Sequence, residues 1–355
     1  MNRRHFLHST AVASLAATSC STIPMHARKP GLAVSAASYM VRQRLGRRKN
    51  GPANGEAFRD TVHFIEHCHQ LGASGVQIGV RDWAKDGLAY RVRDKVEEYG
   101  MVLEGQISLP RKQDELDEFT NTVKTAKEAG VRIFRTVTLG GRRYETFKSL
   151  KEWNEFRDHA WARLTWAEPI MKKNGVQLAL ENHKDWQIEG MVDLMKRLSS
   201  EHIGVNLDTG NNISLLDDGM ETVRALAPYT LTVHLKDMGV EEYEDGFLLS
   251  EVPFGEGVLD VRKIVDICLR ANPNAQFNLE MITRDPLRVP CLTENYWATW
   301  ETPKGEALAE ALDRVRSSSG TRILPTISQL NPSQQVAAEE ANNQRCFSWF
   351  HQTFA

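Results

Sequence analysis

Four short apolar runs in the second half of the chain each stop on a side chain that can bind a metal ion. These runs are Val176–Glu181, Ile203–Asp208, Leu231–His234 and Phe277–Glu280. Each has the length and apolar content of a buried strand, so the carboxylates and the imidazole fall at strand ends. Three carboxylates and one imidazole suit a hard to borderline divalent cation such as Mn, Mg, Co or Zn. The pattern therefore predicts a single metal ion bound by Glu181, Asp208, His234 and Glu280.

The alternation of side chains within these runs places all four candidate ligands on one face. In the first run Leu178 and Leu180 share one face, while Ala179 and Glu181 share the other. The other three runs alternate in the same way, with the ligand opposite the apolar side chains. An open, doubly wound sheet would bury both faces of its strands and show continuous apolar runs. A closed barrel, with polar groups inside and apolar side chains against an outer layer of helices, is therefore the better prediction.

The complete chain supplies enough alternating elements for such a barrel. Eight strand-like runs are Leu32–Ser38, Gly75–Val80, Met101–Ile107, Val131–Val137, Val176–Glu181, Ile203–Asp208, Leu231–Leu235 and Phe277–Glu280. Helix-like patterns lie between and after them, at Glu56–Leu71, Leu88–Tyr99, Gln113–Ala129, Leu150–Lys173, Met191–Ser200, Met220–Ala227, Val261–Arg270 and Gly305–Val315. This alternation predicts an α/β fold, a (β/α)8 TIM barrel, over residues 30–320.

The loops expected at one end of the barrel are rich in arginine and aromatic residues. In such barrels the functional residues lie at the C-terminal strand ends and on the loops that follow them. The loop after the first strand contains Arg42, and the loop after the fourth contains Arg143. The loop after the eighth begins near Arg284 and includes Tyr296 and Trp300. A basic and aromatic rim of this kind favours a polyhydroxylated or anionic small molecule as the ligand.

The composition excludes several classes of partner. The chain has 355 residues, of which 25% are charged and 41% hydrophobic, an ordinary globular composition. Its net charge of −2 provides no general attraction to nucleic acid or to an anionic membrane. The five cysteines are far apart and show no CxxC spacing, so they predict neither a disulfide framework nor a zinc ribbon.

Residues 1–27 are predicted to be a twin-arginine signal peptide. The motif Arg3-Arg4-His5-Phe6-Leu7 precedes a mildly apolar run, Ala11–Ala17, and this run is much shorter than the about 20 residues that span a bilayer. Cleavage before about Arg28 would release a periplasmic protein, and a lipid anchor at Cys20 is the less favoured alternative. Twin-arginine export carries folded proteins, so the metal would be inserted in the cytoplasm before export.

The C-terminal extension, residues 321–355, carries its own structural signal. Gln334–Asn343 has a helical pattern, and Cys346–Phe350 is apolar for a chain terminus. An apolar terminus must be covered by something to avoid exposure to water. It is therefore expected to pack either around the base of the barrel or against a second subunit in a homo-oligomer, and the sequence leaves both open.

Five short motifs resemble the xylose isomerase-like TIM-barrel family of sugar isomerases and epimerases, which includes ketose 3-epimerases and inosose dehydratases. They are Glu181-Asn182-His183, Asp208-Thr209-Gly210-Asn211, His234-Leu235-Lys236-Asp237, Gly255-Glu256-Gly257 and Glu280, and the likeness covers about Leu32 to Arg316. The resemblance implies that the four ligand positions bind a divalent metal, commonly manganese. It also implies a carbohydrate substrate and acid/base roles for Glu181 and Glu280.

This implied role is consistent with the chemistry of enediolate formation. A cation that chelates a carbonyl and a neighbouring hydroxyl stabilises the charge left when a C–H proton is removed. One carboxylate on each face of the substrate can remove the proton on one side and return it on the other, which inverts the centre. His183, Asn211 and Lys236 closely follow the ligands, and Arg284 opens the last rim loop. We expect these four residues to bind substrate oxygens.

The chain departs from the ketose 3-epimerases at three positions. Asn211 stands where they often have a histidine, Val240 where they often have an arginine, and Gln77 where the second strand often ends on a glutamate. The resemblance therefore implies a shared metal platform with different substrate contacts. The leading prediction is a metal-dependent carbohydrate isomerase or epimerase. The alternative is a lyase that expels a β-leaving group from a keto-sugar or keto-glycoside.

Two other classes of protein fit the pattern less well. A nuclease of the endonuclease IV type shares the barrel, but its trinuclear zinc site needs more histidines and acids at strand ends than this chain supplies. A non-catalytic sugar-binding protein would need no second strand-end glutamate beside the metal. An enzyme that acts on a small carbohydrate, and not on nucleic acid, is therefore the prediction.

Overall fold

The computed structural model describes residues 29–46, 57–318 and 324–355. The predicted signal peptide, residues 1–27, and the candidate lipid site at Cys20 lie outside the described residues. Within the described part of the chain, no helix has both the length and the apolar content needed to cross a membrane.

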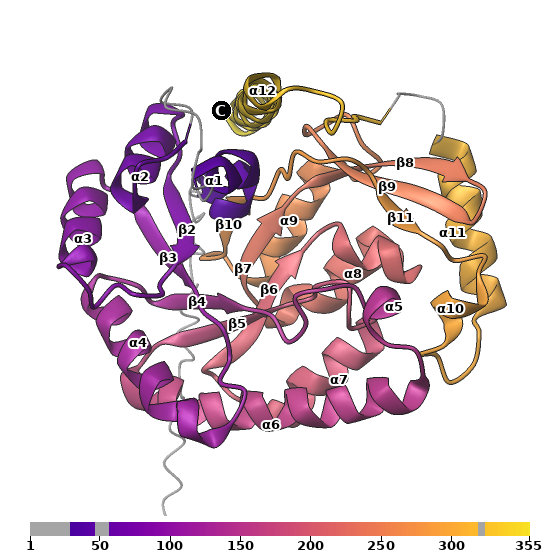
Figure 1. The fold of residues 1–355 in the computed structure, drawn as a ribbon, viewed down its shortest axis with the longest axis horizontal. Helices are drawn as coiled ribbons and strands as arrows, with labels where there is room; N and C mark the ends of the chain where they lie inside the picture. Colours follow the sequence, from indigo (N-terminus) through magenta and orange to yellow (C-terminus); the bar gives the residue numbers. More distant parts are fainter. Residues whose placement is uncertain (1–28, 47–56, 319–323) are drawn as a thin grey trace, which may run out of the picture.

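Eight parallel strands close into a barrel, in the order β1-β10-β7-β6-β5-β4-β3-β2 (Figure 1). They are β1 (Leu32–Ser35), β2 (Gly75–Gly79), β3 (Val102–Gln106), β4 (Ile133–Thr136), β5 (Gln177–Glu181), β6 (Ile203–Asp208), β7 (Thr230–Leu235) and β10 (Gln276–Leu279). The barrel closes where β1 pairs with β10, with Leu32 opposite Phe277. Six strands lie within the predicted runs, and β7 and β10 each begin one residue earlier than predicted, so the predicted (β/α)8 barrel is confirmed.

Seven helices follow the barrel strands and cover their outer face (Figure 1). They are α2 (Thr61–Gln70), α3 (Leu88–Tyr99), α4 (Leu116–Glu128), α6 (Leu150–Asn174), α7 (Ile188–Leu198), α8 (Gly219–Leu226) and α9 (Val261–Ala271). Helix α9 shows why these segments are helical. Asp260 caps its first turn by accepting from the Lys263 N–H, and Ile264, Val265 and Cys268 form one buried stripe.

Short helical segments shape the loops at the barrel mouth. They are η1 (Ala36–Tyr39), α1 (Met40–Gly46), η2 (Gln113–Glu115), α5 (Arg143–Thr146), η3 (Asn211–Leu215) and α10 (Glu294–Trp297). A further short segment, η4 (Ala227–Tyr229), joins α8 to the start of β7 at the opposite end of the barrel. The sequence predicted a basic and aromatic rim here, but part of it is buried. Tyr296 is fully buried, and Arg143 donates to the hydroxyl and carbonyl of Thr299. These two side chains therefore stabilise the loops and are not free to contact a ligand.

A small antiparallel sheet next to the barrel was not predicted. Its strands are β8 (Asp237–Tyr243), β9 (Gly246–Val252) and β11 (Leu287–Val289), in the order β11-β9-β8. The predicted helix after the eighth barrel strand exists as α11 (Gly305–Ser318), but it packs on β8 and β9. This sheet carries Glu251 to the edge of the candidate site, where it pairs with Arg284.

The C-terminal segment forms a long helix, α12 (Pro332–Phe354), that packs on its own barrel. Cys346, Phe347 and Phe350 of this helix belong to the main hydrophobic core. In Figure 1 the helix lies beside α1. The chain's own barrel therefore covers the apolar terminus, but α12 contacts α1 and η1 at the mouth and does not wrap around the base as the first alternative supposed.

The barrel interior below the mouth is polar. Glu104 on β3 accepts hydrogen bonds from Gln77 Nε2 at 3.0 Å, Thr232 Oγ1 at 2.9 Å and Asn278 Nδ2 at 2.9 Å. Burial raises the pKa of the Glu104 carboxyl, and these three donors oppose that shift. Most barrels of this class fill the interior with branched apolar side chains. Here a hydrogen-bonded layer lies directly under the candidate ligands.

Candidate metal centre

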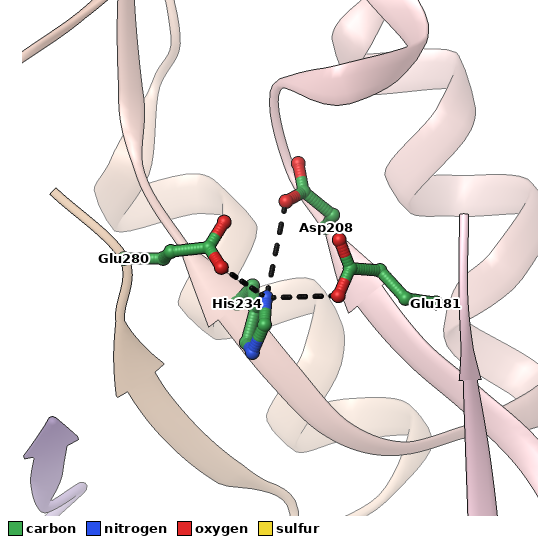
Figure 2. Close-up of side chains that lie close together, drawn as sticks. All are labelled: Glu181, Asp208, His234 and Glu280. Atoms are coloured by element: carbon green, nitrogen blue, oxygen red, sulfur yellow. Dashed lines mark ion pairs between the residues drawn. The ribbon is translucent and has the colours of Figure 1, made fainter. Parts of the chain in front are cut away.

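The four predicted ligands meet at the C-terminal mouth of the barrel. Glu181 ends β5, Asp208 ends β6, His234 is the penultimate residue of β7, and Glu280 directly follows β10. These four strands are consecutive neighbours in the barrel, so their C-terminal ends are adjacent. One ligand atom from each residue lies within 4.8 Å of the other three (Figure 2). The structure thus brings together the whole predicted set.

The His234 imidazole lies at the centre of the cluster. Its Nδ1 is 3.2 Å from Glu181 Oε2, 3.1 Å from Glu280 Oε1 and 4.0 Å from Asp208 Oδ2. This nitrogen is buried, and its contacts to the glutamates lack hydrogen-bond geometry. Without a metal ion, the effect of burial is outweighed by Glu280 and Glu181, which raise the pKa of the imidazole to about 9, so it is protonated; a bound cation would take the place of that proton. A buried nitrogen that faces three carboxylate oxygens without a hydrogen bond is the arrangement that a divalent cation would complete. The donor set therefore fits a metal ion.

Gln77 holds His234 in the form that binds a metal. Gln77 Nε2 donates to the Glu104 carboxylate, so its amide oxygen is directed toward His234 Nε2 at 2.7 Å. An amide oxygen can only accept, so the proton of a neutral imidazole must be on Nε2. The lone pair of Nδ1 is then free for a cation. Gln77 therefore orients one of the four candidate metal ligands.

The carboxylates of the cluster are buried, and two cations balance their charge. Arg135 Nε and Nη2 each lie 2.5 Å from Glu181 Oε2. Lys236 Nζ lies 2.8 Å from Asp208 Oδ2 and 2.6 Å from Glu280 Oε2. A buried carboxylate without a partner would cost several kcal/mol. These contacts allow acidic side chains to be concentrated here before any metal binds.

Electrostatics keeps the two glutamates ionised. Burial raises the pKa of Glu181, but Arg135 and His234 outweigh it and hold that pKa far below its usual value. Burial acts in the same way on Glu280, and His234 and Lys236 again outweigh it. Burial raises the pKa of Asp208 to about 6 despite the nearby Lys236. Both glutamates can therefore act as bases at neutral pH.

The predicted substrate residues have different surroundings. Burial lowers the pKa of His183 to about 3, and its Nδ1 has no described hydrogen-bond partner, so it is a neutral imidazole free to contact a ligand. Asn211 Nδ2 donates to Glu181 Oε1 at 3.2 Å. Lys236 is held between Asp208 and Glu280, within the ligand cluster. Arg284 pairs with Glu251, whose Oε1 is 3.8 Å from Lys236 Nζ.

Two basic residues of the site were not predicted. Arg135 lies on β4, on the opposite face from the buried Phe134, so strand alternation alone could have placed it inside the barrel. Lys184 is buried and donates to Asn211 Oδ1, and burial together with Lys236 lowers its pKa to about 8. Nothing in the local sequence shows that a loop lysine will be buried beside the cluster.

The comparisons with known proteins agree with this barrel. A family model described as xylose isomerase-like TIM barrel matches residues 65–318. A curated relative, a 3-oxo-isoapionate decarboxylase from Pectobacterium atrosepticum, is 24% identical over 200 residues, which cover 56% of this chain and 68% of that protein.

Two solved structures are similar in fold. A xylose isomerase-like TIM barrel protein from Mycobacterium smegmatis, in complex with magnesium, superposes with a TM-score of 0.55 at 18% identity and covers 81% of this chain and 99% of its own. An L-ribulose 3-epimerase superposes with a TM-score of 0.53 at 14% identity and covers 92% of this chain and 94% of its own. The family match spans most of the barrel, so the chain belongs to the xylose isomerase-like TIM barrel family.

Proposed function

We propose that the protein is a metal-dependent carbohydrate isomerase or epimerase that works through an enediolate. One observation carries this proposal: two ionised glutamates approach the same metal-binding nitrogen from opposite sides. Figure 2 shows Glu181 and Glu280 on either side of His234. A binding protein would need no such pair of bases. The similarity in fold to an L-ribulose 3-epimerase supports the same class of reaction.

The residues of the chain supply the proton transfers. One glutamate takes the proton from the carbon next to the carbonyl, and the other delivers a proton to the opposite face. Arg135 and Lys236 hold the two carboxylates in place and keep them ionised. His183, whose Nδ1 has no hydrogen-bond partner among the described residues, is available to orient a substrate hydroxyl. Asn211, in contrast, is held between Glu181 and Lys184 and orients the Glu181 carboxylate. A divalent cation bound by the cluster would stabilise negative charge that develops on the substrate oxygens.

We propose manganese as the cation, with magnesium, cobalt and zinc as alternatives. Oxygen ligands outnumber the single nitrogen, which favours hard to borderline ions and disfavours ions that prefer thiolates. The similar Mycobacterium smegmatis protein was crystallised with magnesium, which is consistent with this range. The four described cysteines are buried and lie outside the cluster.

The second candidate is a lyase on a keto-sugar or keto-glycoside. The same base and cation could remove a proton and expel a β-leaving group, since both reactions begin with the same carbanion. Two observations favour it. The curated relative is a decarboxylase, which also breaks a bond next to an activated carbonyl. The residues that contact substrate in the epimerases are replaced here, at Asn211 and Val240.

Proton exchange separates these reactions. Metal-loaded protein is incubated with keto-sugars in D2O, and the products are followed by NMR. Incorporation of deuterium at the carbon next to the carbonyl, with no group lost, is expected for the isomerase or epimerase. A product that has lost a group supports the lyase. Binding without exchange or product contradicts both proposals.

A further inference from the structure

A large cavity lies beside the candidate metal centre, over the C-terminal ends of β2, β3 and β4. It has a volume of about 940 Å³. Gly79, Gln106 and Arg135 line it from the strand ends, and the loop of residues 107–111 and the start of α4 form its outer wall. None of the four candidate ligands lines it. We refer to it as the β2–β4 cavity.

Arg135 connects this cavity to the site. Its side chain lines the β2–β4 cavity, and its guanidinium is 2.5 Å from Glu181 Oε2. A molecule in the cavity that contacts Arg135 is therefore one side chain away from a proposed catalytic carboxylate. The cavity and the metal centre are thus adjacent parts of the barrel mouth, joined by the Arg135 side chain.

The size of the cavity indicates a substrate larger than one sugar. Pockets for small molecules usually enclose about 300–1,000 Å³, and this one is near the top of that range. A monosaccharide has only about a dozen non-hydrogen atoms and would be held at the cluster, where the bases are. The β2–β4 cavity then remains for a second unit joined to that sugar.

The charge of the lining indicates what that second unit carries. Four arginines line the cavity, Arg81, Arg111, Arg135 and Arg163, against two glutamates, Glu115 and Glu118. Glu115 already accepts from the backbone N–H of Arg111 at 2.7 Å. A concave surface with an excess of one charge attracts ligands of the opposite charge. The guanidinium fork also matches the oxygens of a carboxylate or phosphate.

The four arginines are not equivalent. Arg163 donates to the carbonyl oxygens of Leu109, Pro110 and Thr138, so it holds the wall together. The guanidinium groups of Arg81 and Arg111 are exposed and have no hydrogen bond or ion pair to any residue in the described part of the chain. These two are therefore available to a ligand without the loss of an existing contact.

We propose that the β2–β4 cavity binds an anionic second unit of the substrate, bearing a carboxylate or a phosphate, while the first sugar lies at the metal centre. This rests on the proposed function, which makes the substrate a carbohydrate. Arg81 and Arg111 bind the anion, and Arg135 positions the link between the two units next to Glu181. The substrate is then an acidic glycoside or disaccharide rather than a free ketose.

Calorimetric titration of the full, manganese-loaded protein tests this. The probes are glucose, cellobiose, a disaccharide of glucose and glucuronic acid, and cellobiose 6-phosphate. We expect an acidic disaccharide to bind about tenfold tighter than cellobiose, and cellobiose to bind tighter than glucose. Whichever acidic probe binds better identifies the anion. Equal affinity for acidic and neutral disaccharides would overturn the proposal, as would equal affinity for cellobiose and glucose.

Two sets of variants test whether the acidic disaccharide binds in the β2–β4 cavity or is attracted only by the general charge of the protein surface. Replacing Arg81 and Arg111 together by glutamine should lower the affinity for the acidic disaccharide about tenfold and leave the affinity for cellobiose unchanged. The matched control is Arg91→Gln, an exposed arginine on α3 that should change neither. An unchanged acidic affinity in the double variant contradicts the assignment. These are binding measurements, so they remain informative if the deuterium exchange that tests the proposed function fails.

Discussion

At the level of single residues, the candidate metal centre depends on side chains that do not themselves bind the metal. Gln77 fixes the proton on the far nitrogen of His234, and Arg135 and Lys236 balance the carboxylates. Such supporting side chains commonly change metal affinity by about 10- to 100-fold. The metal site is therefore better described as a buried network than as four ligands.

Gln77→Leu tests this at one position. It removes the acceptor for His234 Nε2 at similar volume, so the imidazole loses the contact that fixes its proton and orientation. We expect manganese affinity, measured by competition with a chelator, to fall about 10- to 100-fold. Gln77→Glu retains an acceptor for His234 Nε2 and should lose much less manganese affinity. An unchanged affinity in Gln77→Leu would show that the contact is incidental.

The sequence predicts the four ligands but not the residues that neutralise them. Glu181, Asp208, His234 and Glu280 each lie at the end of a strand or within one residue of it, a local pattern that strand alternation can reveal. Arg135 contacts Glu181 only because β4 pairs with β5. This contact depends on how the strands pair in the barrel, and no pattern within a single strand predicts it.

At the level of elements, a single serine holds the backbone on both sides of Glu280, at the end of β10 and at the start of the loop that follows. Ser38 Oγ in η1 donates to the carbonyl of Leu279 at 2.7 Å and accepts from the N–H of Met281 at 3.0 Å. Helix α12 holds this serine in turn, because Asn343 Nδ2 donates to the Ser38 carbonyl at 3.0 Å. The C-terminal helix is thus connected through Ser38 to the backbone of a candidate ligand.

Ser38→Ala removes both hydrogen bonds that flank Glu280. We expect the free energy of unfolding in denaturant to fall by about 1–3 kcal/mol, because a buried carbonyl and a buried N–H lose their partner. Ser317→Ala, on the exposed face of α11, is the matched control and should change it by at most about 0.5 kcal/mol. Equal effects of the two substitutions would contradict this role for Ser38.

Glu339 of α12 gives the protein a pH-dependent contact. Its carboxylate accepts from the backbone N–H groups of Val41 and Arg42 at 2.6 and 3.1 Å. Burial nevertheless raises its pKa from the ordinary 4.5 to about 7. The folded state then holds the proton more tightly than the unfolded state. The contribution of Glu339 to stability is therefore fully present below about pH 4.5 and declines as the pH rises to about 7.

Comparison with Glu339→Gln isolates this effect. As the pH rises from 4.5 to 7, the wild type should lose stability relative to the variant. The difference in unfolding free energy between them should change by about 2–3 kcal/mol at most. Glu306→Gln, at an exposed position on α11, should show no such trend. A constant difference between wild type and Glu339→Gln across this range would show that the carboxyl stays ionised in the folded state.

The eight barrel strands and most helices follow from local periodicity, whereas the added sheet does not. Strands β8 and β9 were missed although Asp245-Gly246, with Gly246 at φ 148°, is a turn signal between two strand-like runs. This turn signal was overlooked because strands and helices were expected to alternate strictly. The position of α12 was left open because its partners are about 300 residues away in the sequence, as with Glu339 and Val41.

At the level of the whole molecule, we propose that the barrel is exported after it has folded and bound its metal. Replacing Arg3 and Arg4 together by lysine should retain the protein in the cytoplasm, because twin-arginine export depends on both arginines. Cell fractionation followed by immunoblotting measures this. The same amount of periplasmic protein with and without the substitution would refute the export route.

The central claim is that Glu181, Asp208, His234 and Glu280 bind one divalent cation on which the reaction depends. The most direct measurement is the manganese content of the purified protein after dialysis. We expect about one ion per chain in the wild type, and a loss of affinity of about 100-fold or more in His234→Ala, whose nitrogen lies at the centre of the cluster. One ion per chain retained by His234→Ala with unchanged affinity would contradict the account.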